Sequence, residues 1–219
     1  MPCGTPPGST RVAGVKPARS ERAALVEAAR AAGPDAPTLC GDWTVRELLA
    51  HLILREGRPD AMAGILVRPL AGYTEKVQAQ IAARPFEDLL ETVAGGPPRF
   101  SPLRLVDEQA NLGEYFVHTE DIRRAATGWT PRVLDKRVER GLHDVVGRIA
   151  RVTMRGAPLR ISLTTEEGTV ATVGRGPEVA VIGAIGEVTM WAFGRDEALV
   201  TFEGADGDID LLGAVVRSL

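Results

Sequence analysis

The spacing of apolar residues predicts that most of the first 155 residues are helical. Apolar side chains recur at intervals of three and four, which places them on one face of an α-helix. In the segment 44–57, for example, Val45, Leu48, Leu49 and Leu52 form such a stripe. The same spacing predicts helices over residues 20–33, 44–57, 72–84, 86–94, 107–126 and 135–154.

Residues typical of helix ends and loops support these boundaries. Thr44 followed three residues later by Glu47 is a capping box, in which each residue bonds to the backbone of the other. Ser20 and Asp135 are expected N-caps, because their short polar side chains can accept from a free backbone N–H. Glycine and proline predict a loop over residues 95–105, and loops of this length in compact domains are often functional.

The pattern changes near residue 156, where Gly-Ala-Pro interrupts the helical spacing. Apolar and polar residues then alternate with a period of two, which is typical of strands. Strands are predicted over 159–165, 169–173, 177–183 and 198–204, and helices over 186–194 and 208–219. We therefore expect a flexible tail over 1–18, a helical part over 19–155 and a small α+β unit over 156–219. A unit of about 60 residues is marginal alone, so it should pack on the helices.

The composition limits the classes of function. Hydrophobic residues make up 44% and charged residues 25% of the chain, as in soluble globular proteins. A net charge of −3 implies no broad basic surface for nucleic acid. No apolar run approaches the ~20 residues of a membrane span, and the N-terminus lacks the apolar core of a secretory signal. Cys3 and Cys40 carry no C-x-x-C spacing, which favours a cytoplasmic location. Small-molecule partners are expected, and self-association is left open.

The candidate chemistry centres on the stretch EYFVHTED, residues 114–121. Glu114 and His118 are four residues apart, so a helix presents one oxygen and one nitrogen on the same face. Two ligands are too few for a tight metal site, and a third must come from another element. His51 fits this role better than His143, because ligands on facing helices of a bundle converge inward. Three protein ligands would leave an open position, as in catalytic zinc sites.

The residues alone leave other interpretations open. An acid and a histidine at this spacing are more often an ion pair on a solvated helix face. Asp121 either accepts a hydrogen bond that orients the His118 imidazole or forms an ion pair with Arg124. Cys40 is either a small buried side chain or a reactive thiol.

Three segments resemble a known family. GDWTVRELLAHL, residues 41–52, resembles the W-T-x-x-(E/D)-L-x-x-H-L signature of the DinB-like metal-binding superfamily. EYFVHTEDIRRA, residues 114–125, resembles its second signature, E-x-x-x-H-x-x-D. The domain order and WAFGR, residues 191–195, resemble the mycothiol-dependent maleylpyruvate isomerase branch. The resemblance covers roughly residues 20–204. It implies a DinB-like four-helix bundle as N-terminal domain, followed by a small α+β C-terminal domain.

The resemblance also implies a cofactor and a reaction. A divalent metal would be bound by His51, Glu114 and His118, with zinc favoured and nickel, cobalt and manganese as alternatives. Mycothiol, a low-molecular-weight thiol, would be the cosubstrate. The expected activity is that of an isomerase or a thiol S-transferase acting on a small electrophile.

The remaining candidate residues are assigned by position. Arg55, one turn after His51, and Arg104, in the long loop with Arg99, could hold an anionic group of the thiol or of the acceptor. Arg55 and Asp121 are the candidates for catalytic roles. Two other classes of function stay open: a metal-dependent hydrolase that activates water, and a non-catalytic protein that binds a metal or small molecule.

Overall fold

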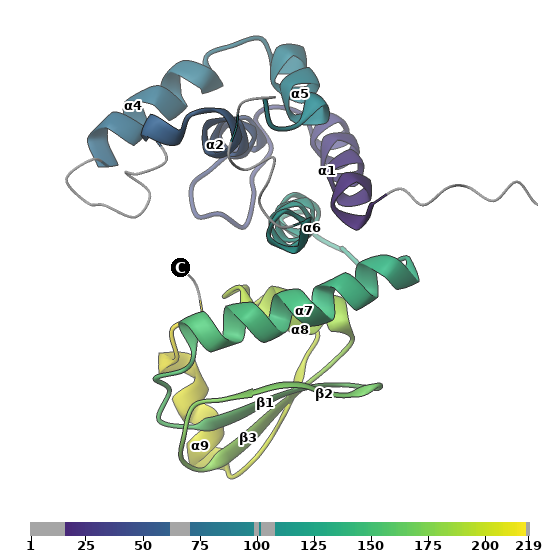
Figure 1. Cartoon of the computed structure of the whole chain (residues 1–219), viewed down its shortest axis with the longest axis vertical. Helices are drawn as coiled ribbons and strands as arrows, with labels where there is room; N and C mark the ends of the chain where they lie inside the picture. Colours follow the sequence, from purple (N-terminus) through teal and green to yellow (C-terminus); the bar gives the residue numbers. More distant parts are fainter. Residues whose placement is uncertain (1–15, 62–70, 99–100, 102–107, 218–219) are drawn as a thin grey trace, which may run out of the picture.

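The computed structural model describes residues 16–61, 71–98, 101 and 108–217 of the chain. The first part of this structure is helical, and a small sheet follows it (Figure 1). The helices of the first part are α1 (Pro17–Ala32), α2 (Val45–Gly57), α4 (Ala71–Ala82), α5 (Phe86–Gly95), α6 (Glu108–Arg124) and α7 (Lys136–Thr153). None of the described helices is long and apolar enough to cross a membrane.

Two of the three predicted caps are confirmed. The backbone N–H of Thr44 donates to the Glu47 carboxylate at 2.7 Å, which completes the capping box at the start of α2. The Asp135 side chain accepts from the backbone N–H of Arg137 at 2.8 Å and caps α7. Each cap satisfies an N–H group that has no partner within its helix, and so fixes where that helix begins.

The prediction that Ser20 caps the first helix is wrong. Helix α1 begins at Pro17, with Lys16 as its N-cap. Proline is well suited to the first helical position, because its fixed φ matches the helix and its missing N–H would have no partner there. Ala18 is buried in the core, which also favours the earlier start. The helix therefore includes the end of the predicted tail, and residues 1–15 lie outside the described part.

The C-terminal part contains a four-stranded sheet in the order β2-β1-β3-β4. Strands β1 and β3 are parallel, and the other neighbours are antiparallel. Helices α7 and α8 lie side by side against one face of the sheet (Figure 1). The elements after α7 are β1 (Arg160–Thr165), β2 (Gly168–Val173), β3 (Glu178–Ile182), α8 (Ile185–Ala192), β4 (Thr201–Glu203), α9 (Asp206–Leu211) and a 3₁₀ turn, Leu212–Ala214.

One hydrophobic cluster runs through both parts. It includes Leu25 of α1, Leu52 of α2, Phe116 of α6, Val146 of α7 and Leu163 of β1, each at most 2% exposed. Helix α7 therefore packs against both α6 and the sheet. The prediction of a mostly helical chain with a small sheet at its end is confirmed. The four-helix bundle stays a prediction, because six helices are described before the sheet and the last of them packs on it.

Buried ion pairs also join the two parts. On α6, Arg124 donates to both carboxylate oxygens of Glu187, from α8, at 2.7 Å each, and to Glu120 at 2.7 Å. Arg132 links Glu120 to Glu21 of α1, with distances of 2.6 Å to each carboxylate. These contacts fix α8 and α1 to the C-terminal end of α6, the helix that also carries Glu114 and His118.

Candidate metal centre

Helices α2 and α6 bring together the three residues proposed as metal ligands. One ligand atom each of His51, Glu114 and His118 lies within 4.8 Å of the others. The ring centroids of the two histidines are 6.0 Å apart, and His118 Nε2 lies 3.3 Å from a carboxylate oxygen of Glu114. His143 lies elsewhere, on α7, where its Nε2 is 3.5 Å from Glu167.

A carboxylate fixes the orientation of the His118 ring. Nδ1 of His118 lies 2.9 Å from Oδ2 of Asp121. Because an ionised carboxylate can only accept, Nδ1 must carry the proton of this hydrogen bond. Nε2 is then the nitrogen available to a cation beside Glu114, and the acceptor on Nδ1 raises its basicity. Of the two alternatives for Asp121, the orienting role matches the structure, since Arg124 pairs with Glu120 and Glu187 instead.

Arg195, which was not among the candidates from the sequence, holds Asp121 in place. Its Nε donates to Oδ1 and its Nη2 to Oδ2, both at 2.8 Å, in a bidentate pair. Gly194, with φ of 84°, ends α8 in the left-handed conformation that glycine adopts readily. Nη1 of Arg195 also donates to the backbone carbonyl of Phe193 at 2.8 Å. The C-terminal part thus supplies Arg195, which contacts Asp121, the carboxylate that orients the candidate ligand His118.

The electrostatics suit a cation at this position. Burial, followed by the charge of His118, lowers the pKa of His51 to about 4, so its imidazole is neutral at pH 7. Burial opposes ionisation of Glu114, but His118, Arg55 and His51 outweigh it and lower its pKa to about 2. Burial also disfavours the charged form of His118, yet hydrogen bonds led by Asp121 raise its pKa well above the ordinary value. A bound cation would replace the proton on His118.

Arg55 lies beside the three candidate ligands. Its Nε is 3.8 Å from a Glu114 oxygen, and its Nη1 donates to Oδ1 of Asn111 at 3.4 Å. Arg55 therefore lies near the site, as its position one turn after His51 indicates. Its role in holding an anionic group stays a prediction. Arg104 and Arg99 lie outside the described residues.

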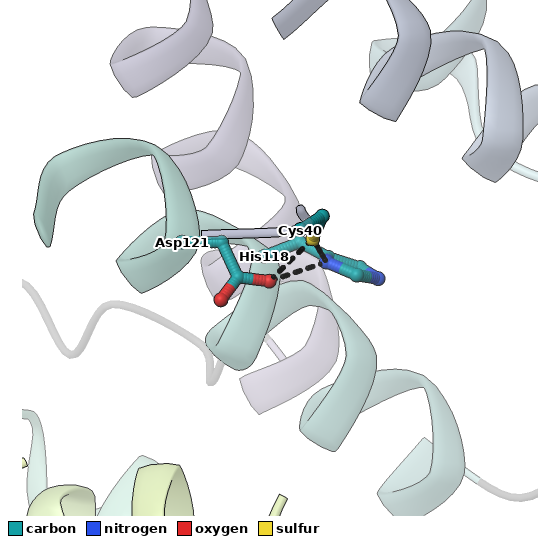
Figure 2. A group of neighbouring side chains, drawn as sticks. All are labelled: Cys40, His118 and Asp121. Carbon is teal, nitrogen blue, oxygen red and sulfur yellow. Dashed lines mark hydrogen bonds and ion pairs between the residues drawn. The ribbon is translucent and has the colours of Figure 1, made fainter. Parts of the chain in front are cut away.

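Cys40 completes a second group of donor atoms, with His118 and Asp121 (Figure 2). Its Sγ donates to Oδ2 of Asp121 at 3.0 Å and lies 3.7 Å from Nδ1 of His118. Arg195 reaches the same sulfur, with Nη2 at 3.5 Å. A guanidinium paired with both oxygens of Asp121 would repel a second cation here. This group therefore holds His118 from its Nδ1 side, away from the nitrogen that is available to a cation.

Comparisons with known proteins agree with this architecture. Residues 15–153 match the family model described as the mycothiol maleylpyruvate isomerase N-terminal domain. The chain is similar to a crystal structure of the mycothiol-dependent maleylpyruvate isomerase, with a TM-score of 0.57 and 17% identity over 85% of this chain and 90% of that one. A histidine-to-alanine mutant of that enzyme gives a TM-score of 0.56 at the same identity and coverage.

These structural matches show a shared fold, because their sequence identity is low. No curated protein sequence matches the chain. The family model, in contrast, covers α1 to α7, which is more than half of the chain and includes all three candidate ligands. The chain therefore belongs to the family defined by the mycothiol maleylpyruvate isomerase N-terminal domain.

Proposed function

We propose that His51, Glu114 and His118 hold a divalent cation, with zinc favoured, that serves a mycothiol-dependent isomerase or thiol S-transferase acting on a small electrophile. The observation that carries this proposal is the convergence of the three ligand atoms within 4.8 Å, in a chain of this family. Two imidazole nitrogens and one carboxylate oxygen suit zinc and leave a position open. Nickel, cobalt and manganese accept similar donors.

The chain's own residues prepare this site for a thiol. A bound divalent cation supplies acidity, because it lowers the pKa of a coordinated thiol from about 8.5 and yields a thiolate at neutral pH. Asp121 keeps the His118 ring oriented through the 2.9 Å hydrogen bond to Nδ1. Arg195 in turn holds both oxygens of that carboxylate.

The thiolate would react with an electrophilic carbon–carbon double bond conjugated to a carbonyl group. As the C–S bond forms, the π electrons move to the carbonyl oxygen, and rotation about the new single bond becomes free. When the electrons return, the C–S bond breaks and releases the isomerised double bond and the thiolate. If the carbon next to the carbonyl instead takes up a proton, equal to the one that the thiol released, the C–S bond persists and the product is a thioether. Arg55, whose Nε lies 3.8 Å from a Glu114 oxygen, would hold an anionic group of the acceptor or thiol.

Titration of the cobalt-substituted protein tests this function. Mycothiol should produce intense sulfur-to-metal charge-transfer absorption in the near ultraviolet, and its S-methyl thioether should not. Binding should release about one proton per site, since the cation replaces the thiol proton. A spectrum that is unchanged at millimolar mycothiol would contradict the proposal and favour a hydrolytic or binding-only role.

A further inference from the structure

A groove of about 620 Å³ lies between the start of α2 and helix α4. It contains none of the three candidate metal ligands. One wall comes from the segment that leads into α2, and the opposite wall comes from the exposed side of α4. The residues that matter for its chemistry are Trp43, Arg46, Glu47, Glu75, Gln78 and Ala79.

Hydrogen bonds across the groove hold its two walls together. Nη1 of Arg46 donates to the backbone carbonyls of Ala82 at 3.0 Å and Arg84 at 2.9 Å. Nε2 of Gln78 donates to the backbone carbonyl of Glu47 at 3.4 Å. The Glu47 side chain is itself held by the capping box with Thr44. The groove is therefore formed before any ligand arrives, which lowers the entropic cost of binding.

The charges in the groove select against anions. Glu47 and Glu75 contribute two carboxylates, whereas the Arg46 guanidinium is directed at backbone carbonyls. Carboxylates and the carbonyl oxygen of an amide accept hydrogen bonds, so a ligand rich in donors is favoured. The Trp43 ring adds an apolar surface against which a ring of C–H groups can pack. This combination fits a neutral or cationic, polyhydroxylated ring compound.

The groove lies next to the candidate metal centre, because Trp43, which lines it, is a neighbour of His51. Glu47, His51 and Arg55 are spaced by four residues, so they lie along one side of the helix, with about 6 Å of axial rise between neighbours. The ring centroids of Trp43 and His51 are 5.0 Å apart. A ligand of two or three linked rings held in the groove would therefore extend past Trp43 toward His51.

We propose that this groove binds the hydroxyl-rich, sugar-type portion of the thiol cosubstrate, while its sulfur lies at the metal centre; the identity of the thiol rests on the proposed function. The groove thus selects a thiol by a part of the molecule that takes no part in the reaction. Binding energy from such a remote part positions the reacting sulfur.

Calorimetry with a thiol-free probe tests the groove by itself. The probe is glucosaminyl-inositol, the sugar portion of mycothiol without its cysteine. Ala79 is exposed in the groove, so Ala79→Phe should fill it without disturbing the core and weaken probe binding by about tenfold or more. Ala23→Phe, at an exposed position on α1, is the matched control and should bind like the wild type. Absence of saturable binding to the wild type, or equal binding to Ala79→Phe, overturns the proposal.

A second titration separates this proposal from the proposed function. In the cobalt protein, Ala79→Phe should weaken binding of mycothiol but leave unchanged that of N-acetylcysteine, which has the thiol and lacks the sugars. If both thiols give the absorption band and the variant changes neither affinity, the groove assignment is wrong and the function stands. If neither thiol gives the band but the sugar probe binds in the groove, the thiol function is wrong and the groove assignment stands.

Discussion

His118 uses both of its ring nitrogens, and the two have different roles. Nδ1 is 2.9 Å from Asp121, and Nε2 is 3.3 Å from Glu114. The two carboxylates explain why the pKa of this imidazole is raised although the ring is buried. Without a metal, a proton on Nε2 gives the imidazole a positive charge, which stabilises its ion pair with Glu114. A cation bound to His51, Glu114 and His118 would take the place of that proton.

At the scale of single residues, alanine substitution of each ligand is the direct test of the metal centre. His51→Ala, Glu114→Ala and His118→Ala should each strongly reduce the metal bound per chain, because two remaining ligands do not form a tight site. Elemental analysis of the purified variants measures this. His143→Ala, on α7, is the control and should keep the wild-type metal content. Full occupancy in His51→Ala would disprove the assigned ligand set.

The sequence predicts some of these residues better than others, for a physical reason. Glu114 and His118 lie on one helix, so their relative position follows from four residues of separation alone. The position of His51 depends on how α2 packs against α6, so its choice over His143 rests on the assumption that ligands converge inside a helical bundle, which the family resemblance supports. Arg195 is 74 residues from Asp121 in the chain, and only the docking of α8 brings them together. No local pattern specifies such a contact.

The helices and strands, too, are predicted where local patterns determine them and missed where packing does. Side-chain spacing and caps predict the centres of the helices from α1 to α8, because these are local properties of the chain. The helix predicted over 208–219 is wrong beyond Leu211, where α9 ends and a 3₁₀ turn follows. The start of α1 was placed too late, since Ser20 is a good cap in isolation but Ala18 gains burial from the earlier start at Pro17. The place of α7 between α6 and the sheet could not be predicted, because its apolar face does not specify the partner.

A buried network around Glu120 should make the α6–α8 contact sensitive to acid. The pKa of Glu120 is lowered because the bonds from Arg124 and the charge of Arg132 outweigh the effect of burial. Since the folded pKa is depressed, the stabilisation is present above the unfolded pKa of 4.5 and is lost as pH falls through the folded pKa. Glu120→Gln should therefore cost on the order of 3 kcal/mol at pH 7, because it removes one of the two carboxylate partners of both Arg124 and Arg132.

Thermal unfolding of Glu120→Gln and wild type between pH 7 and pH 3 measures this effect. The difference in melting temperature should be largest at pH 7 and should shrink in acid, where the wild-type carboxyl is also neutral. Glu139→Gln removes the partner of the exposed Lys136, so it should change stability by less than about 1 kcal/mol. A melting difference for Glu120→Gln that does not vary with pH would show that packing, and not charge, is responsible.

The whole molecule is held together by more than its shared core. The ion pairs of Arg124 with Glu187 and of Arg195 with Asp121 both join the C-terminal part to α6, and each lies within one or two turns of His118. The predicted boundary near residue 156 therefore separates two patterns in the sequence. Whether it also separates two units that fold alone is a prediction that truncation can test.

A chain that ends at residue 155 should keep its helical circular dichroism but melt at a lower temperature. The truncation exposes the face of α7 that packs on the sheet, and exposing buried apolar surface is unfavourable. It also removes Glu187 and Arg195, so Arg124 and Asp121 lose partners. Metal affinity should fall as well, by the 10- to 100-fold range that loss of support for a ligand causes.

Arg195→Ala in the full chain shows which of these losses affects the metal. If the support of Asp121 is responsible, this variant should lose as much metal affinity as the truncated chain while its melting temperature stays closer to that of the wild type. Competition with a chelator measures the affinity of both proteins for zinc. If Arg195→Ala binds zinc like the wild type and only the truncated chain is weakened, the sheet and α8 act by holding α6 in place. A truncated chain without helical signal would mean that the two parts form one inseparable domain, since neither α6 nor α7 could then fold without the sheet.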